Sequence, residues 1–147
     1  MSLEKIDINK HKAYREGTHS RFVSKENNCT HIALNPSGHY VRNFIIDGDV
    51  VPKQDTQTER CDHLLLNDTQ KDSYYIELKG SDLEKAIAQI EKSISMISQS
   101  LPQYKIFRRI IFHSGTHQTQ NQRVVKWKIK HSGSAVIKER TYTDTIS

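Results

Sequence analysis

The chain has 147 residues, with 35% hydrophobic side chains and a formal net charge of +5. This length suits one domain and leaves little room for a second independent core. No apolar run approaches the roughly 18 residues needed to span a membrane. The N-terminus lacks the apolar segment of a secretory signal, and the two cysteines favour reduced thiols. We therefore expect a single cytoplasmic domain over residues 1–147, without membrane contact.

The first part of the chain is polar, and we expect residues 1–20 to form a mobile N-terminal arm. Residues 20–26 are expected to form a short helix. Residues 30–34 and 39–46 are strand candidates. The turn between them is predicted by Asn35-Pro36-Ser37-Gly38, because proline pre-sets one backbone dihedral and glycine tolerates a left-handed conformation.

The middle of the chain predicts a hairpin followed by a helix. Residues 61–66 enter a strand after a polar loop, and residues 73–79 form a second strand, rich in β-favouring side chains. Ser81 is the expected helix cap, with Glu84 in the capping-box position, and the helix ends near Ser100. Five apolar residues recur at helical spacing along it: Leu83, Ile87, Ile90, Ile94 and Ile97.

The last part of the chain predicts two more strands, at residues 104–113 and 135–143. Residues 124–130 are compatible with two structures. Val125, Trp127 and Ile129 alternate as in a strand, whereas a helix that docks one side of Trp127 fits equally well. The order of elements indicates an α/β protein with a mixed sheet.

Three charged residues of the predicted hairpin fall on related strand positions. Side chains alternate between the faces of a strand, so Glu77 and Lys79 share one face. If Leu66 pairs with Ser73, Asp62 lies directly across from Glu77. If Leu66 pairs with Tyr75 instead, Asp62 lies across from Lys79. Either register brings the three groups within cross-strand reach, and a one-residue slip would separate them.

This arrangement suits the chemistry of phosphodiester hydrolysis. Two adjacent carboxylates repel each other unless a cation lies between them, and hard oxygen ligands suit Mg²⁺ or Mn²⁺. Asp62, Glu77 and the backbone carbonyl of Leu78 are the candidate metal ligands. Lys79 would orient or deprotonate the attacking water, or stabilise the charge that develops on the phosphate. The role of a base would require a depressed pKa at Lys79.

Asp62, a spacer of fourteen residues and then Glu77-Leu78-Lys79 resemble the PD-(D/E)XK phosphodiesterase superfamily, which includes many restriction enzymes and resolvases. The resemblance covers roughly residues 40–113. It implies a restriction-endonuclease-like core, with a central mixed β-sheet flanked by helices. It also implies that Asp62 and Glu77 are metal ligands and that Lys79 is the catalytic lysine.

Some positions depart from the pattern of the superfamily. Cys61 stands where the motif has its proline. For the additional acidic residue that members often carry on an N-terminal helix, the candidates are Glu26 and, behind it, Glu16. Gln89, on the helix after Lys79, resembles the accessory glutamine of some members.

The charge distribution favours nucleic acid as the partner. Residues 1–100 contain 13 Lys and Arg against 15 Asp and Glu, whereas residues 101–147 contain nine against two. A basic segment suits a phosphate backbone, because neutralised phosphates release their condensed counterions. We expect a metal-dependent endonuclease that acts on DNA, as a homodimer or with a partner subunit, since cleavage of both strands usually needs two active sites.

Other interpretations of the same residues remain. The chain could be a catalytically inactive nucleic-acid-binding module or a regulatory subunit with a nuclease-like fold. The charged hairpin face could simply be solvated. The apolar stripe of the predicted helix could bind a partner. No metal-ligand cluster of cysteines and histidines and no phosphate-binding glycine loop occurs in the sequence.

Overall fold

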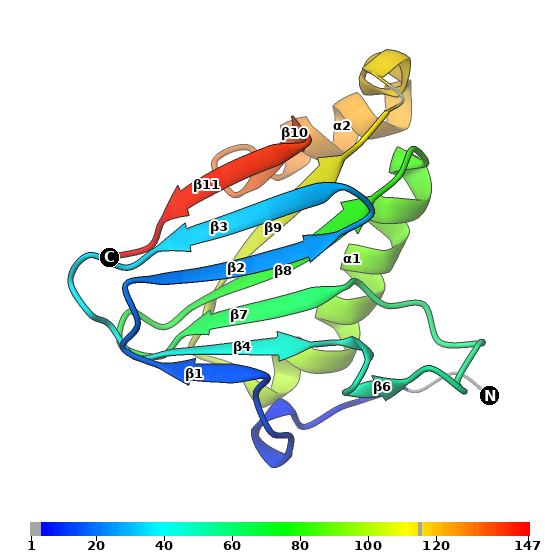
Figure 1. Cartoon of the computed structure of the whole chain (residues 1–147). Helices are drawn as coiled ribbons and strands as arrows, with labels where there is room; N and C mark the ends of the chain where they lie inside the picture. Colours follow the sequence, from blue (N-terminus) through cyan, green and yellow to red (C-terminus); the bar gives the residue numbers. More distant parts are fainter. Residues whose placement is uncertain (1–3, 115) are drawn as a thin grey trace.

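The computed structural model describes residues 4–114 and 116–147, and it consists of three layers (Figure 1). A six-stranded mixed sheet lies in the middle. Helices α1 (Leu83–Ile97) and α2 (Gln122–Lys130) lie on one side of it, and a three-stranded sheet covers the other face. The expected α/β fold with a mixed sheet is therefore confirmed. Helices flank one face of the sheet rather than both, because residues 21–34 and 141–145 pair as strands over the second face.

The large sheet has the strand order β1-β4-β7-β8-β9-β10. Neighbours from β1 to β8 are antiparallel, whereas β8, β9 and β10 run parallel. Its strands are β1 (Arg15–Gly17), β4 (Val41–Ile45), β7 (His63–Asn67), β8 (Asp72–Lys79), β9 (Lys105–Phe112) and β10 (Ala135–Glu139). The small sheet contains β2 (Arg21–Glu26), β3 (Cys29–Leu34) and β11 (Thr141–Thr145). A short parallel pair joins β5 (Asp47–Gly48) and β6 (Val51–Pro52).

Short 3-10 helices complete the chain: η1 (Ile8–Lys10), η2 (Ser98–Ser100) and η3 (Thr116–Gln120). No helix of the described residues is long and apolar enough to cross a membrane.

Strands β7 and β8 form the centre of the protein because both of their faces are covered. Leu64, Leu66 and Tyr75 belong to the core beneath the helices. Leu65 and Ile76 belong to the second core, beneath the small sheet. Apolar side chains on both faces explain why these strands carry near-continuous hydrophobic runs.

Residues 21–26 form strand β2, so the predicted short helix at residues 20–26 is wrong. Phe22 and Ser24 are buried and alternate with more exposed positions, which is the period of a strand. Asn27 and Asn28 turn the chain toward β3 with φ angles of 52° and 60°. Asparagine tolerates this left-handed conformation, and two such residues in succession close a hairpin.

The N-terminal segment is packed rather than mobile over the described residues 4–20. Ile8 is fully buried, and the backbone N–H of Ile6 donates to the carbonyl of Met96 at 2.8 Å. Strand β1 then pairs with β4. This segment is mostly polar, and the few apolar residues that anchor it form no periodic pattern in the sequence. The expected arm therefore does not form here, and residues 1–3 lie outside the described part.

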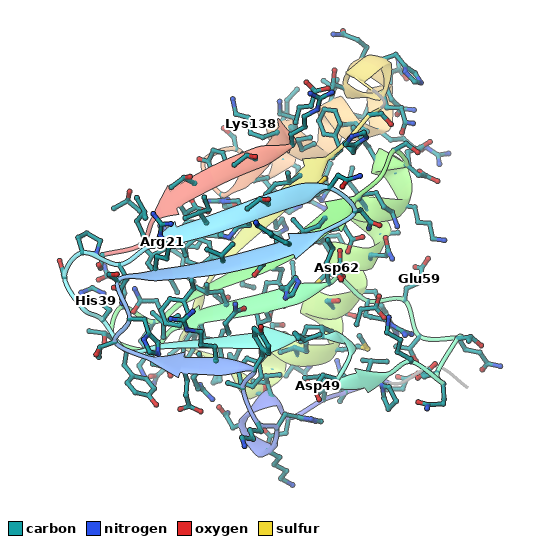
Figure 2. The ribbon with its side chains drawn as sticks, in the orientation of Figure 1. Arg21, His39, Asp49, Glu59, Asp62 and Lys138 are labelled. Carbon is teal, nitrogen blue, oxygen red and sulfur yellow. The ribbon has the colours of Figure 1, made fainter. Side chains whose placement is uncertain are left out.

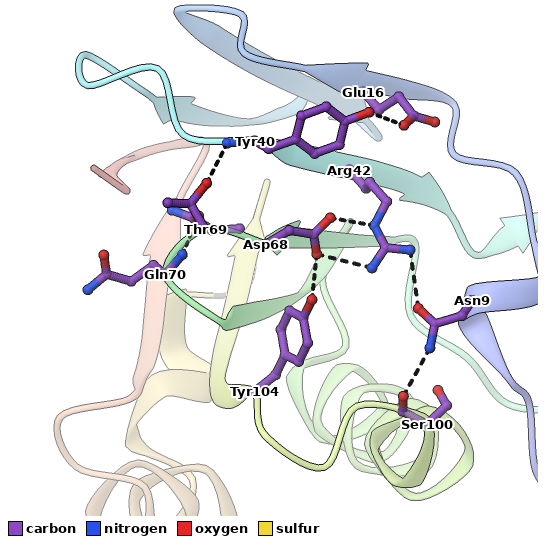
Figure 3. A network of polar contacts seen from close by, with 10 residues as sticks. Asn9, Glu16, Tyr40, Arg42, Asp68, Thr69, Gln70, Ser100 and Tyr104 are labelled. Atoms are coloured by element: carbon purple, nitrogen blue, oxygen red, sulfur yellow. Dashed lines mark hydrogen bonds and ion pairs between the residues drawn. The ribbon is translucent and has the colours of Figure 1, made fainter.

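A polar network fastens this segment to the end of the sheet where β7 turns into β8 (Figure 3). Arg42 donates two hydrogen bonds to Asp68, at 2.7 and 3.0 Å, and Tyr104 donates to the same carboxylate at 2.6 Å. Arg42 also contacts Asn9 at 3.3 Å, and Asn9 in turn donates to the carbonyl of Ser100. The network connects β4, the β7–β8 turn and the end of the helical layer.

The predicted strand at residues 135–143 is divided between two sheets. Strand β10 pairs with β9 of the large sheet, and β11 pairs with β3 of the small sheet. Arg140 lies between them with a φ of 65°. This left-handed residue breaks the extended run and redirects the chain from one layer to the other.

Residues 122–130 form helix α2, which decides between the two structures that the sequence allowed. Val124 and Trp127, three positions apart, are buried, and the Trp127 indole N–H donates to Glu91 of α1 at 3.2 Å. The side chain of Asn121 caps the helix by accepting from the N–H of Arg123.

Asp82, rather than the predicted Ser81, caps helix α1. Its carboxylate accepts a hydrogen bond from the backbone N–H of Lys85 at 3.0 Å. The expected capping box with Glu84 therefore does not form, since the helix begins one residue later. A carboxylate at this position also interacts favourably with the helix dipole.

The Asp82→Ala variant is expected to lose about 0.5–2 kcal/mol of unfolding free energy, because the first turn loses its cap. Urea denaturation followed by circular dichroism measures this loss as a lower midpoint. Ser81→Ala serves as the matched control and should leave the midpoint unchanged. An equal loss in both variants would contradict the assignment of the cap.

Candidate active site at the start of strand β7

Strands β7 and β8 pair in the first of the two registers considered from the sequence. Leu66 lies opposite Ser73, and His63 lies opposite Ile76. One residue earlier, the backbone N–H of Asp62 donates to the carbonyl of Ile76 at 3.1 Å. Asp62 precedes the paired part of β7 and, like His63, lies opposite Ile76, and Figure 2 shows it at the beginning of β7. It is close enough to Glu77 for its negative charge to raise the pKa of that residue.

The side chain of Asp62 accepts a hydrogen bond from a backbone N–H of β8 that has no partner in β7. Strand β8 continues past the start of β7, so the N–H and carbonyl of Leu78 have no strand neighbour on that side. The Asp62 carboxylate accepts from the Leu78 N–H at 2.8 Å. The side-chain amide of Asn27 donates to the Leu78 carbonyl at 2.8 Å. The carbonyl predicted as a metal ligand thus already accepts a hydrogen bond.

Sequence reasoning did not find Asn27. Its contact crosses from the tip of the β2–β3 hairpin to β8, 51 positions along the chain. The consecutive asparagines at positions 27 and 28 are a turn signal that could have predicted the hairpin. The packing of that hairpin over β8 carries no local signal.

Glu77 is buried next to a single cation. It is 2% exposed, and its Oε2 atom lies 3.5 Å from the Nζ atom of Lys79. Its Oε1 atom has no hydrogen-bond partner among the described residues. Burial, followed by the negative charge of Asp62, raises the pKa of Glu77. The fold therefore holds this carboxyl in an environment that disfavours its ionised form.

Asp62 experiences the same kind of environment. It is 6% exposed, and burial raises its pKa despite the opposing hydrogen bond from Leu78. The charges of Glu26 and Asp47 raise the pKa further, whereas the charge of Lys79 lowers it. The site is a buried acidic pair with an excess of negative charge around it.

Of the two additional acidic candidates, Glu26 lies close enough to influence Asp62 and Glu16 does not share this site. Glu16 belongs to β1 and accepts a hydrogen bond from the Tyr40 hydroxyl. Glu26 ends strand β2 rather than a helix. Asp47, which sequence reasoning missed, donates its backbone N–H to the Asp62 carbonyl at 3.3 Å. It is ion-paired with Arg60 at 3.0 Å.

Asp62 and Glu77 could supply two ligands of a divalent cation. The unpartnered oxygen of Glu77 and the raised pKa values of both carboxyls indicate a location where a positive charge would be stabilised. No group of three or more His, Cys, Asp or Glu side chains in the described residues could hold a metal. Two carboxylates suit Mg²⁺, which usually retains several waters and binds through one or two carboxylates and substrate phosphates.

A cavity of about 380 Å³ lies beside this site, between the loop after β6 and helix α1. Asp47 and Arg60 line it from one side, and Lys85 and Gln89 line it from α1. The Oε1 atom of Gln89 is buried without a hydrogen-bond partner among the described residues. The structure therefore places the predicted accessory glutamine in the wall of a polar cavity.

Cys61 is not suited to act as a nucleophile. It is fully buried, and burial raises the pKa of its thiol far above the ordinary range. The reactive thiolate is therefore disfavoured. Cys29 and Cys61 are both free thiols.

We expect the Glu77→Gln variant to be more stable than the native chain at alkaline pH in EDTA. The raised pKa of Glu77 means that the folded state binds more protons than the unfolded state above about pH 4. Native stability therefore falls as pH rises from there through the raised pKa. Glutamine does not titrate, and each unit of pKa shift corresponds to about 1.4 kcal/mol.

Thermal denaturation of both proteins across this pH range measures the effect. The gain of the variant should grow with pH, and added Mn²⁺ should stabilise the native chain more than the variant. A constant difference at all pH values would show that ionised Glu77 is not destabilising.

No protein-family model, curated protein or solved structure matches this chain. The functional interpretation therefore depends on the geometry and electrostatics of Asp62, Glu77 and Lys79.

Proposed function

We propose that this chain is a divalent-metal-dependent nuclease that hydrolyses phosphodiester bonds in DNA. The observation that carries the proposal is the buried pair of Asp62 and Glu77 at the adjoining ends of two paired strands, where the charge of Asp62 raises the pKa of Glu77. Lys79 lies 3.5 Å from Glu77 on the same side of the sheet. Two buried carboxyls with raised pKa values are costly for stability, and perturbed groups of this kind cluster at functional sites.

The arrangement of elements supports a restriction-endonuclease-like core. Three antiparallel strands, β4, β7 and β8, are followed by α1 and by β9, which is parallel to β8. The resemblance noted in the sequence implies this succession of strands, acidic hairpin, helix and strand. The three candidate residues lie at the start of the second of these strands and at the end of the third.

Asp62, just before β7, and Glu77, in β8, would hold Mg²⁺ or Mn²⁺ against the scissile phosphate. When bound, the cation polarises the phosphoryl group and makes water a stronger nucleophile. The side chain of Lys79 is 19% exposed, so its ammonium group can reach a substrate at the edge of the sheet. There it orients the attacking water and stabilises the negative charge that develops on the phosphate.

Calorimetric titration with Mn²⁺ tests the metal site directly. The native chain should bind Mn²⁺, and the Asp62→Asn variant should bind it at least about tenfold more weakly, since it loses a charged ligand. Asparagine retains an oxygen that accepts from the Leu78 N–H, so the fold should persist. The same proteins are then incubated with plasmid, branched and single-stranded DNA in Mg²⁺ or Mn²⁺. Absence of both metal binding and cleavage would reject the proposal.

A second candidate function is a nucleic-acid-binding or regulatory module without catalysis. The hydrogen bond from Leu78 to Asp62 favours it, because that contact gives the carboxylate a structural role. This candidate predicts salt-sensitive DNA binding that Glu77→Gln leaves unchanged, together with no response to Mn²⁺.

A further inference from the structure

The outward surface of helix α2 is strongly basic. Its nine residues include four cations and no carboxylate. Lys126, Lys128 and Lys130 have no ion-pair partner within the described part of the chain, and Arg123 pairs with Glu84 at 3.3 Å while remaining 86% exposed. Val124 and Trp127 are the two buried side chains of the helix, and Arg123, Lys126 and Lys130 border the side that Trp127 docks against α1. Packing therefore explains the apolar side of α2 but not the accumulation of positive charge on its exposed side.

Helix α2 lies at the same edge of the protein as the candidate active site. Beyond the end of β9, the N–H of His113 donates to the carbonyl of Lys79 at 3.0 Å. Gln118 then accepts from the N–H of Leu83 at the start of α1, at 2.8 Å. The segment that leads to α2 is thus attached to the end of β8, which bears Glu77 and Lys79, and to the start of α1. Figure 1 shows α2 beside the beginning of α1.

The cations extend along the helix over the length of several phosphates of a nucleic-acid strand. Arg123, Lys126 and Lys130 follow one side of the helix at positions i, i+3 and i+7, which spans about 10 Å at 1.5 Å per residue. One strand of duplex DNA carries a charge about every 3.4 Å along its axis. This length covers about three phosphate intervals, so each of the three cations can contact a different phosphate of one strand.

We propose that this line on α2, made of Arg123, Lys126 and Lys130, binds the phosphate backbone of duplex DNA. The inference rests on the proposed function, since it assigns that substrate to a surface. Exposed Val125 and Ile129 lie next to the line. Binding of an acidic protein instead of DNA is the alternative outcome of the experiment below. Cations in a row along a helix favour the regularly repeated charge of a nucleic-acid backbone over the irregular charges of an acidic protein surface.

The test compares two triple variants with the same change in net charge. One carries Arg123→Gln, Lys126→Gln and Lys130→Gln. The control carries Lys10→Gln, Lys12→Gln and Lys138→Gln, three exposed lysines outside α2. Glutamine is a good helix former, so α2 should persist, which circular dichroism verifies. Binding to a fluorescein-labelled DNA duplex is measured by anisotropy in EDTA, across a range of salt concentrations.

For three phosphate contacts, the slope of log Kobs against log salt should become less negative by about 2.7 in the α2 variant, and its affinity at low salt should fall at least about tenfold. The control should keep the native slope. Equal losses in both variants would overturn the inference, because overall charge would then explain them. Failure of the native chain to bind the duplex would also overturn it and leave an acidic protein as the partner of α2.

The two proposals fail separately, because binding in EDTA requires neither metal nor cleavage. A native chain that binds through α2 but never cuts DNA would retain this inference and reject the nuclease. If the native chain and the α2 variant cut DNA equally well and show the same salt dependence of binding, the nuclease proposal is retained and this inference is rejected.

Discussion

Replacing Lys79 by alanine should lower the rate of metal-stimulated DNA cleavage by about 100-fold to 10,000-fold, the usual range for loss of one charge-stabilising or proton-transferring group. The fold should survive, because Lys79 ends strand β8 and its side chain is partly exposed. Its charge lowers the pKa of Glu77. In its absence Glu77 protonates more readily rather than remaining as an unpaired buried charge.

Single-turnover cleavage of a labelled duplex in Mg²⁺ or Mn²⁺ measures this loss. Lys12→Ala, which removes an exposed lysine at a distance from β8, is the control and should cut at the native rate. Binding of the duplex in EDTA should be similar for all three proteins. Native-like cleavage by the Lys79 variant would remove this residue from the catalytic mechanism.

Replacing Arg109 by alanine should reduce the unfolding free energy by about 3–5 kcal/mol, because Asp144 would then be a buried charge without its main partner. The Arg109 guanidinium donates to both carboxylate oxygens of Asp144, at 2.8 and 2.9 Å. His31 lies 2.8 Å from the same carboxylate. These contacts join β9 of the large sheet to β11 and β3 of the small sheet.

The pKa of Asp144 shows the balance at this site. Burial raises it, but hydrogen bonds from His31 and Arg109 lower it more, so the net value lies below the ordinary one. The ionised carboxylate therefore stabilises the native state at neutral pH. That contribution is lost as pH falls through the ordinary carboxyl range toward the depressed pKa.

Chemical denaturation at neutral pH measures the loss. Arg123→Ala is the matched control: its ion pair with Glu84 is exposed, so the change should stay below about 1 kcal/mol. The double variant Arg109→Ala/Asp144→Ala should be more stable than the sum of the single losses implies, since the isolated charge is gone. Additive losses would mean that the ion pair is not what joins the two sheets.

The sequence by itself determined the centre of the fold and the faces of its charged residues. The apolar runs around Leu65 and Ile76 predict the central hairpin because each strand is covered on both sides. The helical stripe from Leu83 to Ile97 predicts α1 because its period is local. The strict alternation of side chains in a strand likewise places Glu77 and Lys79 on one face, and it restricts Asp62 to two useful registers.

Only the tertiary structure decided which of those registers is used, how the second face of the sheet is covered and where the third layer comes from. Strand β2 was expected to be a helix, because a segment of six residues is too short for its hydrophobic pattern to distinguish a helix from a strand. Pairing with β3 decides the outcome. Residues 135–145 form two strands, separated at Arg140, because the first part pairs with β9 and the second part pairs with β3. The hydrogen bond from Asn27 to Leu78 likewise joins distant segments. Contacts between residues far apart in the chain leave no periodic pattern in the sequence, so they emerge only when the layers pack.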